Sequence, residues 1–327
     1  MIKNTKLIAT LGPSSLKTVI LSKLKKDVDI FRLNMSHLTI KELKKNLKFL
    51  KKNKIKNICI DTEGAQIRTS NVKKKFLRKN SYYYLSNKKL NLKNSIRLYP
   101  LFDFNNLKEK TIVKIGFDGL ELEVTKNYKN YLKCKVIKEG ILDTNKGVHF
   151  HADIFLNPLT EKDLQAINIA KQFNVKMFAL SFANSSNDIL ILRSKLDKKD
   201  LIISKIETKK GFFNRKKIAS VSNAILIDRG DLSRYIEISK IPLAQRIIIK
   251  DAKKLNKEVY VATNLLETMI MSNDPTRAES NDVYSSLETG CSGLVLAAET
   301  AIGNNPVECI KFLKQCLHVF YRRRKFN

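Results

Sequence analysis

The sequence lacks the usual features of secreted, membrane-spanning or zinc-binding proteins. Its five cysteines are odd in number and scattered, with no spacing typical of a zinc site or a disulfide framework. No stretch approaches the roughly 20 apolar residues that a membrane-spanning helix needs. The first residues run directly into an apolar, strand-like segment rather than a signal sequence. We therefore expect a cytoplasmic protein whose cysteines are reduced and structural.

Acidic residues are scarce, because 31 Asp and Glu stand against 62 Lys and Arg and leave a formal net charge of +31. Such a field would attract any polyanion, so nucleic acid stays a candidate partner. A nucleic-acid-binding module clusters its charge and interleaves aromatic residues. Here Lys is spread over predicted helix faces, Trp is absent, and the one compact basic run, 322–325, lies where cations complement a helix dipole. The composition argues against a nucleic-acid partner.

Short apolar, β-branched segments recur at regular intervals and predict eight buried strands, with amphipathic helical patterns between most of them. A chain of 327 residues, 43% of them hydrophobic, suits one α/β barrel with an insertion. Eight β/α units imply a closed parallel (β/α)8 TIM barrel. The predicted strands are Leu7–Leu11, Ile30–Leu33, Ile58–Ile60, Met177–Ser181, Leu201–Ile206, Ala224–Ile227, Val259–Ala262 and Leu294–Leu296. The predicted helices include Ser15–Lys26, Ile40–Lys52, Glu161–Phe173, Asn187–Leu196, Leu243–Leu255 and Pro306–Arg324.

The rhythm of strands and helices is interrupted after the third strand, from Asn71 to Asn145. This stretch lacks long helical periodicity and contains alternating or aromatic segments broken by Asn, Gly and Lys, as in a small β-barrel. We therefore expect a barrel domain formed by residues 1–70 and 146–327, an inserted β domain at 71–145, and no further domain. The expected strands of the insertion are Tyr82–Leu85, Thr111–Ile115, Leu120–Val124 and Tyr131–Ile137.

Polar residues end most of the predicted barrel strands, where a β/α barrel builds its active site. Residues two apart in a strand share a face. The second strand thus presents Arg32, Asn34 and Ser36 together, and the fifth presents Lys205 and Glu207 together. The third strand ends in Asp61-Thr62-Glu63-Gly64, the sixth in Asp228-Arg229-Gly230-Asp231 and the seventh in Ala262-Thr263-Asn264. We expect these side chains to meet at one rim.

Glu207 and Asp231, on adjacent strands, present two carboxylates that suit a hard divalent cation, Mg²⁺ or Mn²⁺. Lys205 beside them is a cation suited to a phosphoryl group or a developing enolate. Gly230 and Asp231 open a turn whose backbone N–H groups could receive a substrate carboxylate. The alternative interpretation is that Lys205 forms a purely structural ion pair with a carboxylate.

The order of these segments resembles pyruvate kinase from Thr5 to about Cys316. The first two motifs of that family are matched by Thr5-Lys6-Leu7-Ile8-Ala9-Thr10-Leu11-Gly12-Pro13-Ser14-Ser15 and Phe31-Arg32-Leu33-Asn34-Met35-Ser36-His37. The others are matched by Asp61-Thr62-Glu63-Gly64-Ala65-Gln66-Ile67-Arg68-Thr69, Ile203-Ser204-Lys205-Ile206-Glu207, Arg229-Gly230-Asp231-Leu232, Ala262-Thr263-Asn264-Leu265-Leu266-Glu267-Thr268-Met269, Pro275-Thr276-Arg277-Ala278-Glu279 and Glu299-Thr300-Ala301.

The resemblance implies a role for each matching position. By this resemblance, Lys205 would stabilise phosphoryl transfer and the enolate, Glu207 and Asp231 would hold the divalent metal, and Thr263 would lie near the carbon that is protonated. Positions for a monovalent cation, K⁺, are Asn34, Ser36, Asp61 and the Thr62 carbonyl. Positions near the transferring phosphate and the nucleotide are Arg32, His37, Arg68 and Lys146. The substrates implied are phosphoenolpyruvate and ADP, the products pyruvate and ATP, and the insertion becomes a lid. A homodimer through the barrel is a further expectation.

The chain also departs from the family pattern. We expect the C-terminal regulatory domain that is usual in the family to be absent, and sugar-phosphate control with it. The third-strand motif reads Glu63-Gly64-Ala65-Gln66 where the family usually has Lys-Gly-Pro-Glu, which leaves K⁺ dependence open. After the fourth strand, Ser181-Phe182-Ala183-Asn184 lacks the usual basic pair, and Ser233 replaces a glycine. On the eighth strand Ala297-Ala298 replaces Ser-Gly and removes a hydroxyl of the family's proposed proton relay.

Three functions follow from these patterns. The first is a pyruvate kinase that transfers the phosphoryl group of phosphoenolpyruvate to ADP. The second keeps the enolpyruvate chemistry but passes the enolate or phosphoryl group to another acceptor, as a lyase or carbon–carbon-bond-forming enzyme in a specialised sugar pathway. The third, ranked last, is a non-catalytic scaffold that binds polyanions through its charge of +31.

Overall fold

The computed structural model describes residues 5–116, 119–152 and 154–322. The chain divides into two compact units, one formed by Met1–Gly64 with Glu161–Asn327 and the other by Ala65–Thr160. The first unit holds the strands of the predicted barrel. The second corresponds to the predicted insertion and is longer at both ends than residues 71–145.

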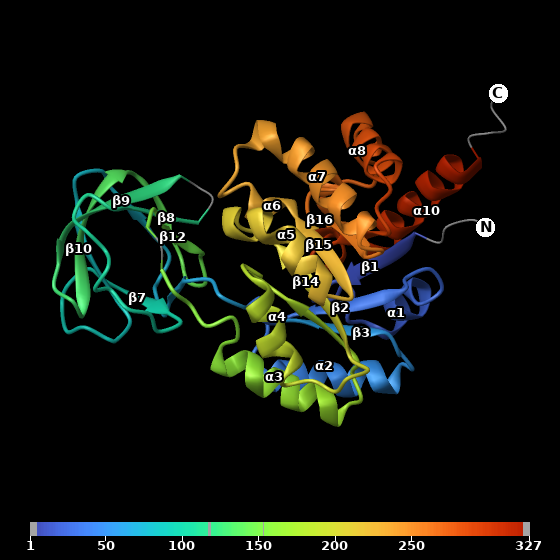
Figure 1. Cartoon of the computed structure of the whole chain (residues 1–327), viewed down its shortest axis with the longest axis horizontal. Helices are drawn as coiled ribbons and strands as arrows, with labels where there is room; N and C mark the ends of the chain where they lie inside the picture. Colours follow the sequence, from blue (N-terminus) through green and yellow to red (C-terminus); the bar gives the residue numbers. More distant parts are fainter. Residues whose placement is uncertain (1–4, 117–118, 153, 323–327) are drawn as a thin grey trace. The chain divides into compact units, whose positions relative to one another are not determined.

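Eight of the described strands close into a parallel barrel in the order β1-β17-β16-β15-β14-β13-β3-β2 (Figure 1). The predicted (β/α)8 barrel is therefore confirmed, and each predicted strand agrees with its observed strand to within one residue at either end. The observed bounds are β1 Lys6–Thr10, β2 Ile30–Asn34, β3 Ile58–Asp61, β13 Met177–Leu180, β14 Leu201–Ile206, β15 Ala224–Asp228, β16 Glu258–Ala262 and β17 Gly293–Leu296.

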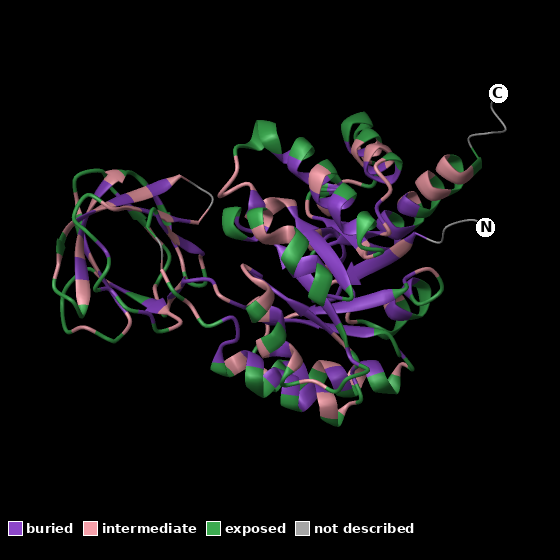
Figure 2. Cartoon of the chain, in the orientation of Figure 1, coloured by how far each residue is buried: buried purple, intermediate pink, exposed green. Residues whose placement is uncertain are grey.

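The barrel strands are apolar on both faces because side chains fill the interior while helices cover the outside. The ribbon is accordingly buried along the strands, with exposed residues on the outer helix faces (Figure 2). The inward cluster is built from Ile8, Ile30, Cys59, Ala179, Ile203, Ala224, Leu226, Tyr260, Ala262 and Val295. Burial of this apolar surface stabilises the barrel at roughly 25 cal/mol per Å².

Helices follow the strands and complete the β/α units. The longer ones are α2 Ile40–Lys52, α3 Glu161–Gln172, α4 Ser186–Arg193, α5 Lys209–Val221, α7 Ile241–Lys254, α8 Arg277–Glu288 and α10 Pro306–Arg322, and the shorter ones are α1 Thr18–Leu24, α6 Arg229–Leu232 and α9 Ala298–Ala301. Helix α2 begins with a capping box in which Thr39 and Glu42 bond to each other's backbone N–H. None of the described helices has the length and apolar character needed to cross a membrane.

Two predicted helices are shorter than expected. The helix predicted to begin at Ser15 begins at Thr18, because the Ser15 hydroxyl accepts a hydrogen bond from Gly12 N at 3.1 Å and forms a turn there. The helix predicted to end at Leu196 ends at Arg193. Arg322 ends α10, and the remaining residues of the basic run, 323–325, lie outside the described part of the chain. All five cysteines are free thiols, as expected.

The second unit is a small, mainly antiparallel β-barrel-like sheet in the order β12-β8-β9-β10-β6-β7-β4. Its two end strands, β4 Arg68–Ser70 and β12 Val148–Phe150, are joined through an antiparallel bridge between Arg68 and Gly147. Because both end strands lie outside 71–145, the unit extends beyond the expected insertion. The other strands are β6 Tyr82–Ser86, β7 Ser95–Tyr99, β8 Ile112–Ile115, β9 Leu120–Asn127 and β10 Tyr131–Lys138, with β5 Lys75–Leu77 and β11 Gly140–Leu142 in a separate pair.

Candidate active site

Strand register brings the predicted polar residues to one rim of the barrel. Asn34 on β2 pairs with Asp61 on β3, and Asp61 pairs with Ala179 on β13. On the other side, Lys205 on β14 pairs with Leu226 on β15, two residues before Asp228. Parallel strands direct their carboxyl ends to the same edge, so the end of each strand delivers its polar group to a shared site.

The Lys205 ammonium lies at the centre of this site. Its Nζ lies 2.8 Å from Glu207 Oε1, 3.2 Å from Asp61 Oδ2 and 3.8 Å from Asp228 Oδ2. It also donates to the Ser181 hydroxyl at 3.0 Å. Burial by itself lowers the pKa of Lys205, but the Asp61 and Glu207 carboxylates outweigh it and raise the pKa above the ordinary value. Lys205 is therefore a permanent cation.

A second buried cation, Arg32, is fixed next to Lys205. Its Nε donates to Asp61 Oδ2 at 2.7 Å, and its Nη1 donates to the Thr10 hydroxyl at 2.9 Å. Arg32 is only 4% exposed and Asp61 is fully buried. Asp61 is thus shared by both cations, and this sharing holds the Arg32 and Lys205 side chains at the same side of the rim.

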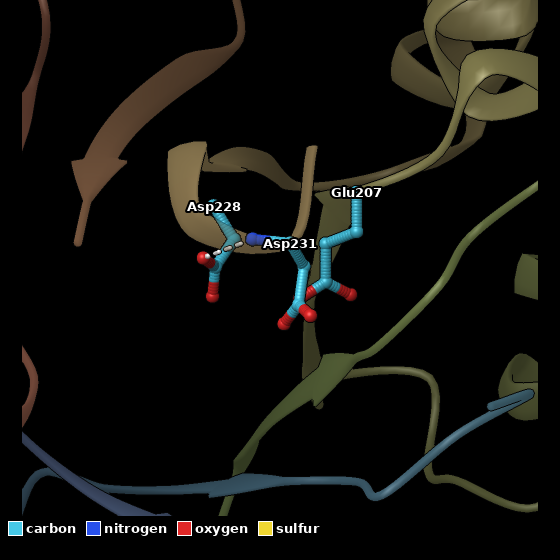
Figure 3. A group of neighbouring side chains, drawn as sticks. All are labelled: Glu207, Asp228 and Asp231. Carbon is cyan, nitrogen blue, oxygen red and sulfur yellow. Dashed lines mark hydrogen bonds between the residues drawn. The ribbon is translucent and has the colours of Figure 1, made fainter. Parts of the chain in front are cut away.

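Three carboxylates, Glu207, Asp228 and Asp231, converge beside these cations (Figure 3). One oxygen from each lies within 4.8 Å of the others. Glu207 is fully buried; its Oε2 accepts from Phe182 N at 2.6 Å, while its buried Oε1 has the Lys205 ion pair but no partner in hydrogen-bond geometry among the described residues. A carboxylate oxygen at the edge of such a cluster is also a suitable ligand for a hard divalent ion.

The charges of the site also favour an added cation. The site has three cations, Arg32, Lys205 and Arg234, and Arg234 lies at its edge with Nε 3.4 Å from Asp231 Oδ1. These cations face four carboxylates, those of Asp61, Glu207, Asp228 and Asp231. Burial, opposed by Lys205 but reinforced by Asp228, raises the pKa of Glu207 to about 8. Burial also acts to raise the pKa of Asp228, but Lys205 and the Thr263 hydroxyl hold it below its ordinary value. An oxygen-seeking divalent ion would relieve this crowding, so these residues fit the metal that the sequence implies.

Thr263 and Gly230 lie against the carboxylates. The Thr263 hydroxyl donates to Asp228 Oδ1 at 2.6 Å. A Cβ at Gly230 would lie 2.7 Å from Thr263 Cγ2, so only glycine fits there. Gly230 and Asp231 form the first turn of the four-residue helix α6, which Asp228 caps by accepting from Asp231 N at 3.4 Å. The motif after β15 therefore places Asp231 and leaves room for Thr263.

Comparison with known proteins identifies the family of the chain. A family model described as "Pyruvate kinase, barrel domain" matches residues 2–310. The chain belongs to the pyruvate kinase family. A protein named pyruvate kinase from Thermotoga maritima is 33% identical over 331 residues, covering 96% of this chain and 70% of the relative. Relatives of the same name from Buchnera aphidicola (35% identical; 94% of this chain, 68% of the relative) and Staphylococcus aureus (30%; 95% and 56%) also match.

Two site residues were not assigned a role from the sequence. Asp228 completes the carboxylate cluster, and its position as the last residue of β15, before Arg229-Gly230-Asp231, was the available signal. Ser181 is 3% exposed, and its hydroxyl accepts from Lys205. The Thr62 carbonyl at 2.7 Å and Asp61 Oδ1 at 3.1 Å are the two acceptors within reach of its single proton. Ser181 follows the end of β13, but its contacts come from the ends of two other strands, β3 and β14.

The four positions expected to hold a monovalent cation lie on β2, β3 and the turns after them. Asn34 Oδ1 accepts from Ser36 N at 3.0 Å and caps a short 3-10 turn at Met35–His37. The expectation that Ser36 shares a strand face with Arg32 was therefore wrong, since β2 ends at Asn34. The Asp61 carboxylate and the Thr62 carbonyl both lie within hydrogen-bond distance of the Ser181 hydroxyl. A K⁺ site here stays a prediction.

The remaining predicted binding residues divide between the two units. His37 is exposed in the turn after β2. Arg68 and Lys146 lie together in the second unit, because the antiparallel bridge between Arg68 and Gly147 brings their segments side by side. The Lys146 backbone N donates to the Thr69 hydroxyl at 2.8 Å in the same region. Their role in nucleotide binding stays a prediction.

The altered third-strand motif has its own partners. The Glu63 carboxylate forms an ion pair with Lys162 at 2.9 Å. The backbone N–H groups of Glu63 and Gly64 donate to the two carboxylate oxygens of Asp163 at 2.8 and 3.1 Å. After β17, the carboxylate of Glu299 in α9 accepts from the backbone N of Ala297, the N-cap of that helix, at 2.7 Å. The replaced residues are therefore held in ordered turns.

Proposed function

We propose that this protein transfers the phosphoryl group of phosphoenolpyruvate to ADP, giving pyruvate and ATP. The observation that supports this most directly is the placement of Lys205 at the barrel mouth beside Glu207, Asp228 and Asp231. Membership of the pyruvate kinase family supports phosphoenolpyruvate and ADP as the substrates.

Glu207 and Asp231, joined by Asp228, would hold Mg²⁺ or Mn²⁺. Bound there, the ion would supply charge to the phosphoryl oxygens and orient them. Lys205 adds a fixed positive charge where negative charge develops on the transferring phosphoryl group and the enolate oxygen. Because Lys205 and its carboxylates are buried, their field is screened less than at an exposed site. Their mutual contacts hold this charge in place before substrate arrives.

Thr263 is the group that we propose to lie near the carbon that receives a proton. Its hydroxyl donates to Asp228, which fixes the direction of the O–H bond in the protein without substrate. Arg32, held by Asp61 and Thr10, would bind the phosphate, and Arg68 and Lys146 of the second unit would contact the nucleotide. K⁺ binding at Asn34, Ser36, Asp61 and Thr62 and a homodimer through the barrel belong to the same proposal.

A coupled assay with phosphoenolpyruvate, ADP, Mg²⁺ and K⁺ tests the proposed reaction. We expect equal amounts of pyruvate and ATP, with K⁺ omitted in a parallel series to test the monovalent site. Glu207→Gln should abolish Mg²⁺-dependent turnover, while Glu237→Gln, which removes an exposed carboxylate paired with Lys240, should not. Turnover that survives Glu207→Gln would contradict the assignment of the metal site.

A second function is favoured by Ala297 and Ala298, which replace the Ser-Gly expected in the family and remove a hydroxyl. In this alternative the enolate is poorly protonated at carbon and instead attacks an aldehyde acceptor. Incubation of the protein with pyruvate, an aldehyde and Mg²⁺, beside a parallel assay with phosphoenolpyruvate and ADP, distinguishes the two. A condensation product of pyruvate and the aldehyde without any ADP phosphorylation supports the alternative, and full kinase turnover excludes it.

A polyanion-binding scaffold is the least supported function. Such a protein has no need for two buried cations and four carboxylates at one barrel rim. Salt-sensitive retention on heparin, together with no Mg²⁺-dependent binding of phosphoenolpyruvate, would favour it.

A further inference from the structure

Thr263 has an unusual backbone conformation for its residue type. Its φ is +75°, and Asn264 follows with φ +56°. A β-branched residue in the left-handed region is strained and persists only where the surrounding structure holds it. Thr263 also bears the hydroxyl that donates to Asp228. Whatever holds this backbone therefore also sets the position of that hydroxyl.

The Arg229 guanidinium holds the Thr263 backbone in place through hydrogen bonds. Its Nη2 donates to the Thr263 carbonyl at 2.6 Å, and its Nε donates to the same carbonyl at 3.1 Å and to the Ala262 carbonyl at 3.3 Å. Two donors from one rigid, planar group converge on a single oxygen. This contact fixes the Thr263 carbonyl and, through it, the peptide that must adopt the left-handed conformation.

The remaining nitrogen of the same guanidinium, Nη1, is bonded to a carboxylate on a helix outside the barrel strands. Arg229 Nη1 donates to both carboxylate oxygens of Asp282, at 2.8 Å to Oδ1 and 2.6 Å to Oδ2. Asp282 lies in the middle of α8, and the Arg229 side chain is only 12% exposed. Charge-assisted contacts of this kind are short and directional. They leave Arg229 little freedom to turn away from Thr263.

We propose that Asp282 and Arg229 are positioning residues that hold Thr263 in its left-handed conformation and thereby aim its hydroxyl at Asp228 and the substrate. Neither residue is among those that we propose to contact the substrate or the metal. This inference rests on the proposed function for its kinetic consequence, since Thr263 is taken to act near the protonated carbon. The positioning itself is a property of the protein alone.

Asp282→Asn is the variant that tests the proposal, because it keeps the shape and removes the charge that anchors Arg229. We expect kcat to fall about 10- to 100-fold, the loss expected when a catalytic group is displaced by about 1 Å. The KM for ADP should stay within twofold of wild type. Asp282→Glu restores the carboxylate and should recover part of the loss.

Asp251→Asn is the matched control. Asp251 on α7 accepts from Arg215 on α5, with Oδ2 2.8 Å from Nε and 2.7 Å from Nη2, so it forms another Arg–Asp pair between elements of the same barrel. The remaining contacts of Arg215 are with Phe212 in its own helix. Asp251→Asn should lower the Tm by about as much as Asp282→Asn but leave kcat unchanged. An equal loss of kcat in both variants, or none in Asp282→Asn, overturns the proposal.

A crystal structure of the full-chain Asp282→Asn variant keeps the inference separate from the proposed function. We expect Thr263 to leave the left-handed region and its hydroxyl to lose the bond to Asp228. If wild type shows no transfer from phosphoenolpyruvate to ADP, the proposed function fails, but this structure still decides the positioning role. An unchanged Thr263 backbone in the variant would refute it.

Discussion

Replacing Lys205 by Met removes the central charge of the site while keeping an unbranched side chain of similar length. The ammonium has three carboxylate neighbours, at 2.8 Å in Glu207, 3.2 Å in Asp61 and 3.8 Å in Asp228. Arg32 stays bonded to Asp61 in the variant. Glu207 and Asp228 lose their nearest cation, so the variant reports on both the charge given to substrate and the charge balance of the folded protein.

Two magnitudes follow for Lys205→Met. Loss of one preorganised charge or donor at a reacting group costs about 3–4 kcal/mol, or 100- to 1,000-fold in kcat. Breaking a buried ion pair by removing one partner costs about 3–5 kcal/mol of stability, because a buried charge is left uncompensated. The stability loss should be smaller in the presence of Mg²⁺, since a bound divalent ion supplies charge to the same carboxylates.

Coupled pyruvate kinase assays and urea unfolding, each with and without Mg²⁺, measure these effects. Lys176→Met is the matched control, because Lys176 forms ion pairs with Asp197 and Asp200 at 3.1 and 3.4 Å but is half exposed and lies before β13. The control should keep wild-type kcat and a stability close to that of wild type, because exposed ion pairs are screened by water. A Lys205→Met enzyme that keeps more than a tenth of wild-type kcat would refute the role given to Lys205.

Three further predictions concern the carboxylates and the turn beside them. In metal-free protein the pKa of Glu207 is raised from 4.5 to about 8, so its ionisation opposes folding. The free energy of unfolding should therefore fall by up to about 5 kcal/mol as the pH rises from 4.5 to 8. Glu207→Gln should remove this pH dependence in urea titrations, and an unchanged pH dependence in the variant would contradict it. Asp228→Asn should weaken Mg²⁺ binding at least about tenfold by calorimetry, whereas unchanged affinity would exclude Asp228 from the metal site. Gly64→Ala should lower stability by about 1 kcal/mol or more, because Gly64 has φ +67° and an added Cβ would lie 2.6 Å from Ser181 O; wild-type stability in chemical denaturation would show that the turn can relax.

Much of the barrel could be predicted from the sequence, because buried parallel strands occur in it as short apolar segments between amphipathic helical segments. The order of polar residues after those segments likewise pointed to Lys205, Glu207 and Asp231 as neighbours. The ends of the insertion were harder to predict, because β4 and β12 have only three residues each and are too short to show a periodic pattern.

Contacts that depend on register between strands could not be predicted from local pattern. Ser181 meets Lys205 only because β13 and β14 pair with a specific register. The Arg229–Asp282 contact joins residues 53 apart in sequence, and no local pattern indicates that pairing. Ser36 was misplaced because the Asn34 side chain caps a turn that ends the strand, a choice decided by side-chain hydrogen bonding rather than by alternation.

The most direct test of the central claim is incubation of the protein with phosphoenolpyruvate, with and without ADP and Mg²⁺, followed by mass analysis of all products. Phosphoryl transfer at the Lys205 and carboxylate cluster predicts pyruvate and ATP in equal amounts, formed only when both ADP and Mg²⁺ are present. No Mg²⁺-dependent consumption of phosphoenolpyruvate, or consumption that yields another product without ATP, would contradict it.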